Sequence, residues 1–78
     1  METIQTLAET HRSLPAPRVR RGLRLAAGLA LEDLAEVVGV GKATVSRWER
    51  GLREPRGEPR VRYAAALRQL REVVGRGE

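Results

Sequence analysis

The chain has no cysteine, no phenylalanine and a single histidine among its 78 residues. Without cysteine it has neither a disulfide framework nor a thiol nucleophile, and His11 alone cannot supply the paired histidines of a zinc finger. A chain of this size also leaves little room for a deep catalytic pocket. Because no nucleophile is accompanied by a base, we expect no enzyme activity, no catalytic residue, no metal and no cofactor.

Long apolar runs are also missing. The longest, residues 25–31, is seven residues long, whereas a membrane-spanning helix needs roughly 18 to 20. The first 14 residues are polar and mixed in charge, unlike a secretory signal. We therefore expect a cytoplasmic protein without a membrane-spanning segment.

Positive charge, in contrast, is abundant. Fifteen Lys and Arg residues face ten Asp and Glu residues, a net charge of +5, and Lys42 is the only lysine. Such a balance suits nucleic acid, an anionic membrane surface or an acidic protein partner. The preference for arginine also fits a GC-rich coding sequence, so the placement of the cations is more informative than their number.

A first helical stripe precedes two prolines. Apolar or aromatic residues recur there at spacings of three, four and three, namely Ile4, Leu7, His11 and Leu14. Pro15 and Pro17 interrupt this pattern, because each proline removes a hydrogen-bond donor and disfavours helix in the residue before it. We interpret residues 1–14 as an N-terminal helical extension and residues 15–17 as a proline-containing linker.

Residues 18–74 are predicted to form one all-α domain, since no segment alternates with the period of a strand. Helices are expected over residues 18–27, 31–38, 42–50 and 60–74, followed by a tail at 75–78. Gly28 and Gly39 are typical of helix C-termini. Val19 and Val61 are expected on inner faces. Two interpretations stay open for Arg18, Arg20 and Arg21: they reach the phosphate backbone or, as we favour, they form a solvated helix face. The arginines beyond the expected DNA footprint are interpreted as solvated, namely Arg62, Arg68, Arg71 and Arg76.

The spacing over residues 31–50 is typical of a helix-turn-helix motif, with a second or recognition helix at 42–50. Only three residues join the two helices; Gly39 permits a sharp turn, Val40 fills the angle, and Ala35 allows close approach. At about 100° per residue, Val45 and Trp48 lie on the buried side of the second helix. The predicted core of the motif is Leu34, Ala35, Gly39, Val40, Val45 and Trp48.

The opposite side of helix 42–50 suits duplex DNA, because the major groove admits a helix whose N-terminal residues face base edges. We predict base contacts from Lys42, Ala43 and Arg47: the cations donate to guanine, and the alanine methyl packs on a thymine methyl. Phosphate contacts fix register without reading sequence. They are predicted for Thr44, Ser46, Arg50, Arg53 and Arg56, and for the backbone N–H groups of Leu31 and Glu32.

These residues resemble the Cro/C1 (XRE-type) helix-turn-helix family over about residues 18–70. The matching residues are Leu23-Arg24, Ala27-Gly28-Leu29, Leu34-Ala35, Gly39-Val40, Thr44 to Gly51, Pro55, Tyr63-Ala64 and Leu67. The resemblance implies a lambda-repressor-like bundle of four to five short helices, here with an extra N-terminal helical segment. It also implies a structural ion pair between Arg24 and Glu49.

Two departures from the family affect these expectations. Lys42 and Ala43 stand where many members have glutamine, which shifts the expected base preference towards G·C pairs. Ala30 and Leu31 replace a common Ser or Thr followed by Gln, and alanine as a helix N-cap costs roughly 0.5 to 2 kcal/mol relative to Ser or Thr.

The resemblance predicts a sequence-specific double-stranded DNA-binding transcription regulator, a repressor of a phage, mobile element or bacterial operon. It would bind as a homodimer, with half-sites about 34 Å apart. We expect no separate sensor domain in a chain of this length and therefore no small-molecule ligand. The alternative is an antitoxin-like or other protein-interaction module that binds a partner protein through residues 2–14.

Overall fold

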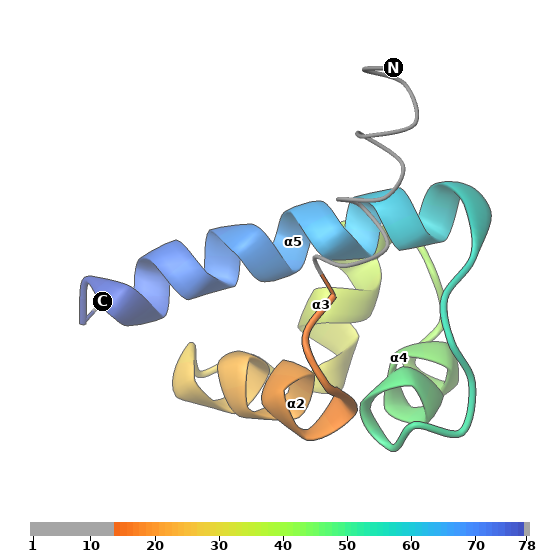
Figure 1. The fold of residues 1–78 in the computed structure, drawn as a ribbon, viewed down its shortest axis with the longest axis horizontal. Coiled ribbons are helices and arrows are strands. Elements are labelled where there is room, and N and C mark those ends of the chain that lie inside the picture. The colour runs from red at the N-terminus through yellow and green to blue at the C-terminus, as the bar shows by residue number, and fades with distance from the viewer. Residues whose placement is uncertain (1–13, 78) are drawn as a thin grey trace.

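Four α-helices form the described part of the chain, residues 14–77 of a computed structural model (Figure 1). They are α2 (Pro17–Ala26), α3 (Leu31–Val38), α4 (Lys42–Glu49) and α5 (Gly57–Gly75), and no strand occurs within residues 14–77. The predicted all-α class is therefore confirmed. Apart from Leu14, the expected N-terminal helical extension lies outside the described residues.

The helix boundaries follow local sequence chemistry. α2 begins at Pro17, one residue before the expected start, because proline is favoured in the first turn, where its missing N–H needs no partner. α5 begins at Gly57, three residues before the expected start, and contains Pro59 in its first turn. α4 ends at Glu49, so Arg50 is its C-cap rather than its last helical residue.

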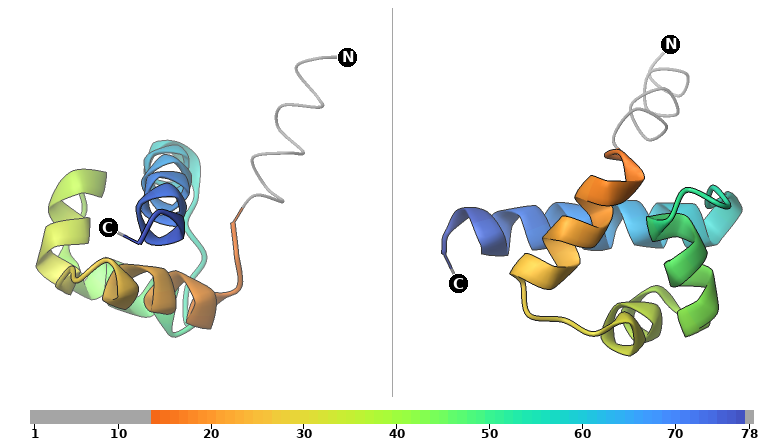
Figure 2. Two further views of the ribbon diagram at one scale, coloured as in Figure 1. Left: turned by 90° about the vertical axis from the view of Figure 1, so that its left-hand side faces the viewer. Right: turned by 90° about the horizontal axis from the view of Figure 1, so that it is seen from below.

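The longest helix, α5, lies across the other three and closes the core on one side (Figure 1). It packs against α2 and α3, while α4 packs against both α2 and α3. The view from below in Figure 2 shows α2 crossing α5, with α3 and α4 beside them. One side of α4 therefore remains uncovered.

The core lies between α3, α4 and α5. It contains the buried residues Leu34, Ala35, Val38, Val45, Trp48, Tyr63, Ala66, Leu67 and Leu70. The rings of Trp48 and Tyr63 have centroids 4.6 Å apart and a tilted arrangement. Leu14, the last residue of the expected N-terminal stripe, packs against this core while remaining partly exposed.

Tyr63 is fully buried, yet its hydroxyl has no hydrogen-bond partner among residues 14–77. Burial, as the largest cause, raises the pKa of this hydroxyl well above the ordinary tyrosine value of 10.0. The ring is thus held by packing, and its polar atom gains no compensating hydrogen bond from the described part of the chain.

The expected inner positions of Val19 and Val61 are wrong, because their exposed fractions are 41% and 56%. In α5 the buried face is set by Tyr63, Leu67 and Leu70, which recur every three or four residues. Val61 precedes Tyr63 by two residues, a rotation of about 200° around the helix, so it points away from the core.

Candidate nucleic-acid interface

A sharp turn between α3 and α4 sets the position of the second helix. Gly39 has φ of +82° and ψ of 34°, in the left-handed region that favours glycine. The N–H groups of Gly39 and Val40 both donate to the Ala35 carbonyl, at 2.8 and 3.0 Å. Gly41 is extended and forms the N-cap of α4. This geometry forms the helix-turn-helix motif.

Arg62 of α5 stabilises the C-terminal end of α3. Its Nε donates to the Val38 carbonyl at 2.7 Å, and its Nη1 lies 3.4 Å from the Glu58 carboxylate. The interpretation of Arg62 as merely solvated is therefore wrong. A cation at a helix C-terminus also interacts favourably with the helix dipole.

The N-terminus of α3 has a partial cap despite its alanine. The Ala30 N–H donates to Oδ2 of Asp33 at 2.8 Å, which is one half of a capping box. Ala30 has no side-chain oxygen to accept the other hydrogen bond of a capping box, from the Asp33 N–H. The expected weakness of the alanine N-cap therefore concerns this second hydrogen bond only.

An ion pair joins α2 to the end of α4. Arg24 donates from Nε and Nη2 to the two carboxylate oxygens of Glu49, at 2.7 and 2.9 Å. Both residues are buried, with exposed fractions of 7% and 6%. Arg24 also donates to the Leu29 carbonyl at 2.9 Å. The hydrogen bond with Glu49 raises the pKa of Arg24, so the guanidinium stays charged.

Arg20 makes a second buried connection, and its interpretation as a solvated residue is wrong. Its exposed fraction is 4%, and it donates to the carbonyls of Pro15 and Trp48 at 2.7 and 3.1 Å. It also lies 3.1 Å from the Glu54 carboxylate. Arg20 precedes Arg24 by four residues, which places the two on one helix face, a spacing that could have indicated the shared role.

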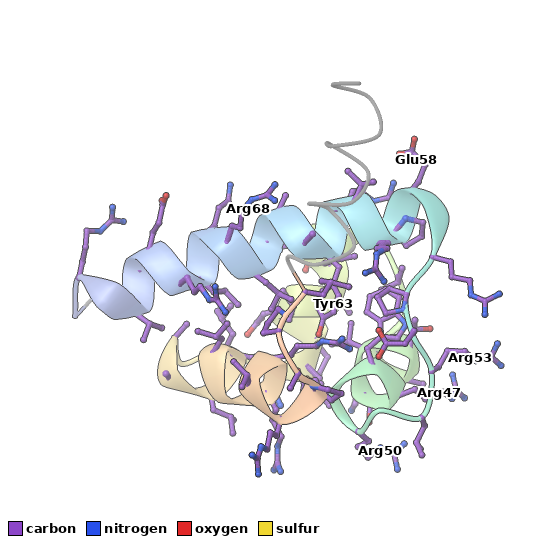
Figure 3. The ribbon with its side chains drawn as sticks, viewed as in Figure 1. Arg47, Arg50, Arg53, Glu58, Tyr63 and Arg68 are labelled. Carbon is purple, nitrogen blue, oxygen red and sulfur yellow. The ribbon has the colours of Figure 1, made fainter. Side chains whose placement is uncertain are left out.

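The predicted DNA-contacting side chains lie on the uncovered side of α4 and in the loop after it. Lys42, Ala43, Arg47 and Arg50 are exposed on α4 and its C-cap, and Thr44 and Ser46 are partly exposed. Arg53 and Arg56 are exposed in the loop. Figure 3 shows Arg47, Arg50 and Arg53 projecting away from the core residue Tyr63, on a different side of the molecule from Arg68.

Two shallow surface depressions flank this helix. One is lined by Thr44, Arg47 and Arg53. The other lies between α2, α3 and α4, and its lining residues are Arg18, Arg21, Arg24, Leu31, Ser46, Glu49 and Arg50. The exposed residues Arg18 and Arg21 of α2 thus share a surface with Ser46 and Arg50, which periodicity within α2 alone did not indicate.

Among the cations predicted to contact DNA, only Lys42 has an acidic partner within residues 14–77, because its Nζ lies 3.7 Å from Oε2 of Glu32. The exposed residues Arg47, Arg50, Arg53 and Arg56 form no ion pair with the described acidic residues. The other acidic residues near α4 are engaged elsewhere, Glu49 with Arg24 and Glu54 with Arg20. The uncovered side of α4 is therefore strongly positive.

Residues 14–77 contain no group of three or more His, Asp or Glu side chains that could hold a metal ion. None of the described helices is long and apolar enough to cross a membrane.

This arrangement defines the class: a helical bundle in which a sharp glycine turn presents a cation-bearing second helix, as in helix-turn-helix DNA-binding domains. A helix-turn-helix family profile matches residues 21–72, two thirds of the chain. The chain therefore belongs to this family, the Cro/C1 or XRE type of DNA-binding regulatory domain. No curated protein and no solved structure matches it.

Proposed function

We propose that the protein is a sequence-specific double-stranded DNA-binding regulator that inserts α4 into the major groove. The observation that carries this proposal is the uncovered side of α4, where exposed cations accompany a helix whose other side is buried. Lys42 and Arg47 donate to guanine N7 and O6, and the Ala43 methyl contacts a thymine methyl. Because two of these three residues contact guanine and only one contacts thymine, we expect the preferred sites to be rich in G·C pairs.

A larger set of groups holds the sugar-phosphate backbone on both sides of the groove. The side chains in this set are Thr44, Ser46, Arg50, Arg53 and Arg56, together with the backbone N–H groups of Leu31 and Glu32. Arg18 and Arg21 extend it, because they line the depression that also contains Ser46 and Arg50. Their charges supply affinity and register rather than sequence information.

In the cell, we propose that the protein acts as a repressor of a phage, mobile element or bacterial operon, and that it binds as a homodimer. Two copies related by a two-fold axis would place one α4 in each of two half-sites about 34 Å apart. Family membership supports this proposal, since DNA-binding domains of this type read palindromic sites in pairs.

The test begins with selection of bound sequences from a random duplex pool, which yields half-site sequence, spacing and symmetry together. Binding of the selected duplex and of a random duplex is then measured over a NaCl series. If three to five phosphates are neutralised per subunit, log K falls against log salt with a slope of about −3 to −4.5 per subunit. Recovery of no preferred sequence would contradict sequence-specific binding.

The Arg47→Ala variant distinguishes a base contact from electrostatic attraction to the phosphates. We expect it to weaken binding to the selected duplex by roughly fivefold to a hundredfold and to relax the preference at one position. Arg68→Ala is the matched control, because Arg68 is exposed on α5, away from Arg47 (Figure 3). Equal weakening of selected and random duplexes by Arg47→Ala would instead make Arg47 a phosphate contact.

A further inference from the structure

An acidic side chain lies at the edge of the proposed DNA-binding surface. Glu32 is the second residue of α3, Lys42 is the first residue of α4, and their carboxylate and ammonium groups are 3.7 Å apart. Both side chains are exposed, at 66% and 61%. The pair therefore bridges the N-terminal ends of the two helices of the motif on its solvent side.

This position is unusual on electrostatic grounds, because a carboxylate repels the phosphates that the neighbouring arginines attract. An exposed ion pair contributes little to folding, so fold stability gives little reason for it. Glu32 is favoured at its position by the positive end of the α3 dipole, which would favour any acidic residue in the first turn. Its pairing with Lys42, rather than its presence alone, needs a functional account.

We propose that Glu32 is a specificity-determining residue that acts through Lys42. An ammonium group already balanced by a carboxylate is a poor counter-ion for phosphate, because neutralising a phosphate with it would leave the carboxylate unpaired. Lys42 still has hydrogen-bond donors that Glu32 does not occupy, and these donate to base acceptors when the correct sequence lies beneath α4. Glu32 thereby lowers sequence-independent affinity and raises the ratio of specific to non-specific binding.

This inference rests on the proposed DNA-binding function, and the chain offers variants that test it. Glu32→Gln removes the carboxylate charge while keeping the side-chain size, which frees the Lys42 ammonium for a phosphate. Glu58→Gln is the matched control, since Glu58 is also an exposed acid that lies 3.4 Å from a cation. Glu58 lies on the opposite side of the molecule from Arg50 (Figure 3).

The measurement is the binding constant for a random duplex over a NaCl series, with the selected duplex in parallel. We expect Glu32→Gln to steepen the random-duplex salt slope by about 0.9, the increment for one added phosphate contact. Affinity for the random duplex should rise roughly two- to fivefold at low salt, and affinity for the selected duplex should rise less. Glu58→Gln should leave the slope unchanged.

A second background tests whether Lys42 carries the effect. In a Lys42→Met protein, Glu32→Gln should no longer change the slope, because no ammonium group remains to reach a phosphate. An equal steepening in this background, an equal steepening by Glu58→Gln, or an unchanged slope in Glu32→Gln would overturn the proposal. Failure of the unaltered protein to bind any duplex would instead overturn the proposed function itself.

Discussion

Two arginines of α2 enter the interior four residues apart and hold the end of α4 from the same side. Arg24 pairs with Glu49, and Arg20 bonds the Trp48 carbonyl and Glu54. The first pair followed from the family resemblance, whereas the second was missed because arginine is almost never fully buried without a partner. Its partner, Glu54, lies 34 residues away in a loop, a distance that helical periodicity does not bridge.

We expect Glu49→Ala to destabilise the domain by about 3 to 5 kcal/mol, because it leaves the buried Arg24 guanidinium unpaired. That cost approaches the whole stability of many small domains. Urea or thermal unfolding followed by circular dichroism measures it, with Glu36→Ala at an exposed position of α3 as the control. A melting temperature equal to that of the unaltered protein would contradict the structural assignment.

Replacing both charged partners serves as the companion experiment. In Arg24→Met with Glu49→Leu, no buried charge is left alone, so stability should recover most of the loss caused by Glu49→Ala. Failure to recover would indicate that the bond from Arg24 to the Leu29 carbonyl, rather than the ion pair, is the main contribution.

Tyr63 gives a prediction with a pH signature. Its buried hydroxyl has no hydrogen-bond partner within the described residues 14–77, so Tyr63→Phe should leave stability at pH 7 unchanged or raise it by about 1 kcal/mol. Because the folded pKa is raised above the ordinary 10.0, the native state keeps its proton when the unfolded chain has lost it. The stability that the protonated Tyr63 supports is therefore fully present below pH 10. As pH rises above 10, the free energy of unfolding falls by up to about 1.4 kcal/mol per pH unit.

The measurement is the free energy of unfolding between pH 7 and 11 for both proteins. The unaltered protein should lose stability above pH 10 more steeply than Tyr63→Phe. Parallel curves would contradict the raised pKa, and a large loss at pH 7 would reveal a hydrogen bond that the hydroxyl makes.

Among the elements, the α3-turn-α4 unit was predictable almost to the residue, because a glycine and a strict apolar spacing define it. The bounds of α5 were less predictable. Pro55, Gly57 and Pro59 indicated a broken loop, whereas proline and glycine are compatible with a first helical turn, where backbone N–H groups need no intrahelical partner. Which face of α5 is buried depends on which of its residues pack on Trp48 of α4. This is a contact between distant parts of the chain, which the periodicity of α5 alone does not specify.

Two glycine substitutions are expected to change stability in opposite directions, one in the turn between α3 and α4 and one within α2. Gly39→Ala should destabilise the domain by about 1 to 2 kcal/mol, since φ of +82° is strained for alanine even though its Cβ would find ordinary contacts with Arg62. Gly22→Ala should stabilise it by about 0.5 to 1 kcal/mol, because Gly22 lies within α2 with open space around it.

Chemical denaturation of both variants beside the unaltered protein checks these signs. DNA binding should follow the fold, with Gly22→Ala leaving the affinity for the selected duplex unchanged. Stabilisation by Gly39→Ala would mean that the turn adopts another conformation in solution.

At the scale of the whole molecule, a group of exposed cations lies on α4 and in the loop that follows it. The exposed Arg47, Arg50, Arg53 and Arg56 have no acidic partners among residues 14–77 and repel one another. Sequence composition gave the sign and size of the net charge. The grouping of Arg18 and Arg21 with α4 required the packing of α2 against α4.

This grouping predicts that salt acts in opposite directions on folding and on binding. Raising NaCl from 50 to 500 mM should raise the melting temperature of the free protein, because screening weakens repulsion between exposed cations more than the attraction within the buried pairs. The extra stability conferred by a bound duplex should decline over the same range. Melting curves with and without duplex provide the measurement, and a falling melting temperature of the free protein would contradict it.

The uncovered side of α4 has a consequence for how such a protein diversifies. Lys42, Ala43 and Arg47 are exposed, and substitutions at exposed positions outside the packed core usually change stability by less than about 0.5 kcal/mol. Under the proposed function, single codon changes there alter which sequence is preferred without endangering the fold. A small protein that reads DNA in the proposed way acquires a new target through few mutations, each of which leaves a folded chain for selection to act upon.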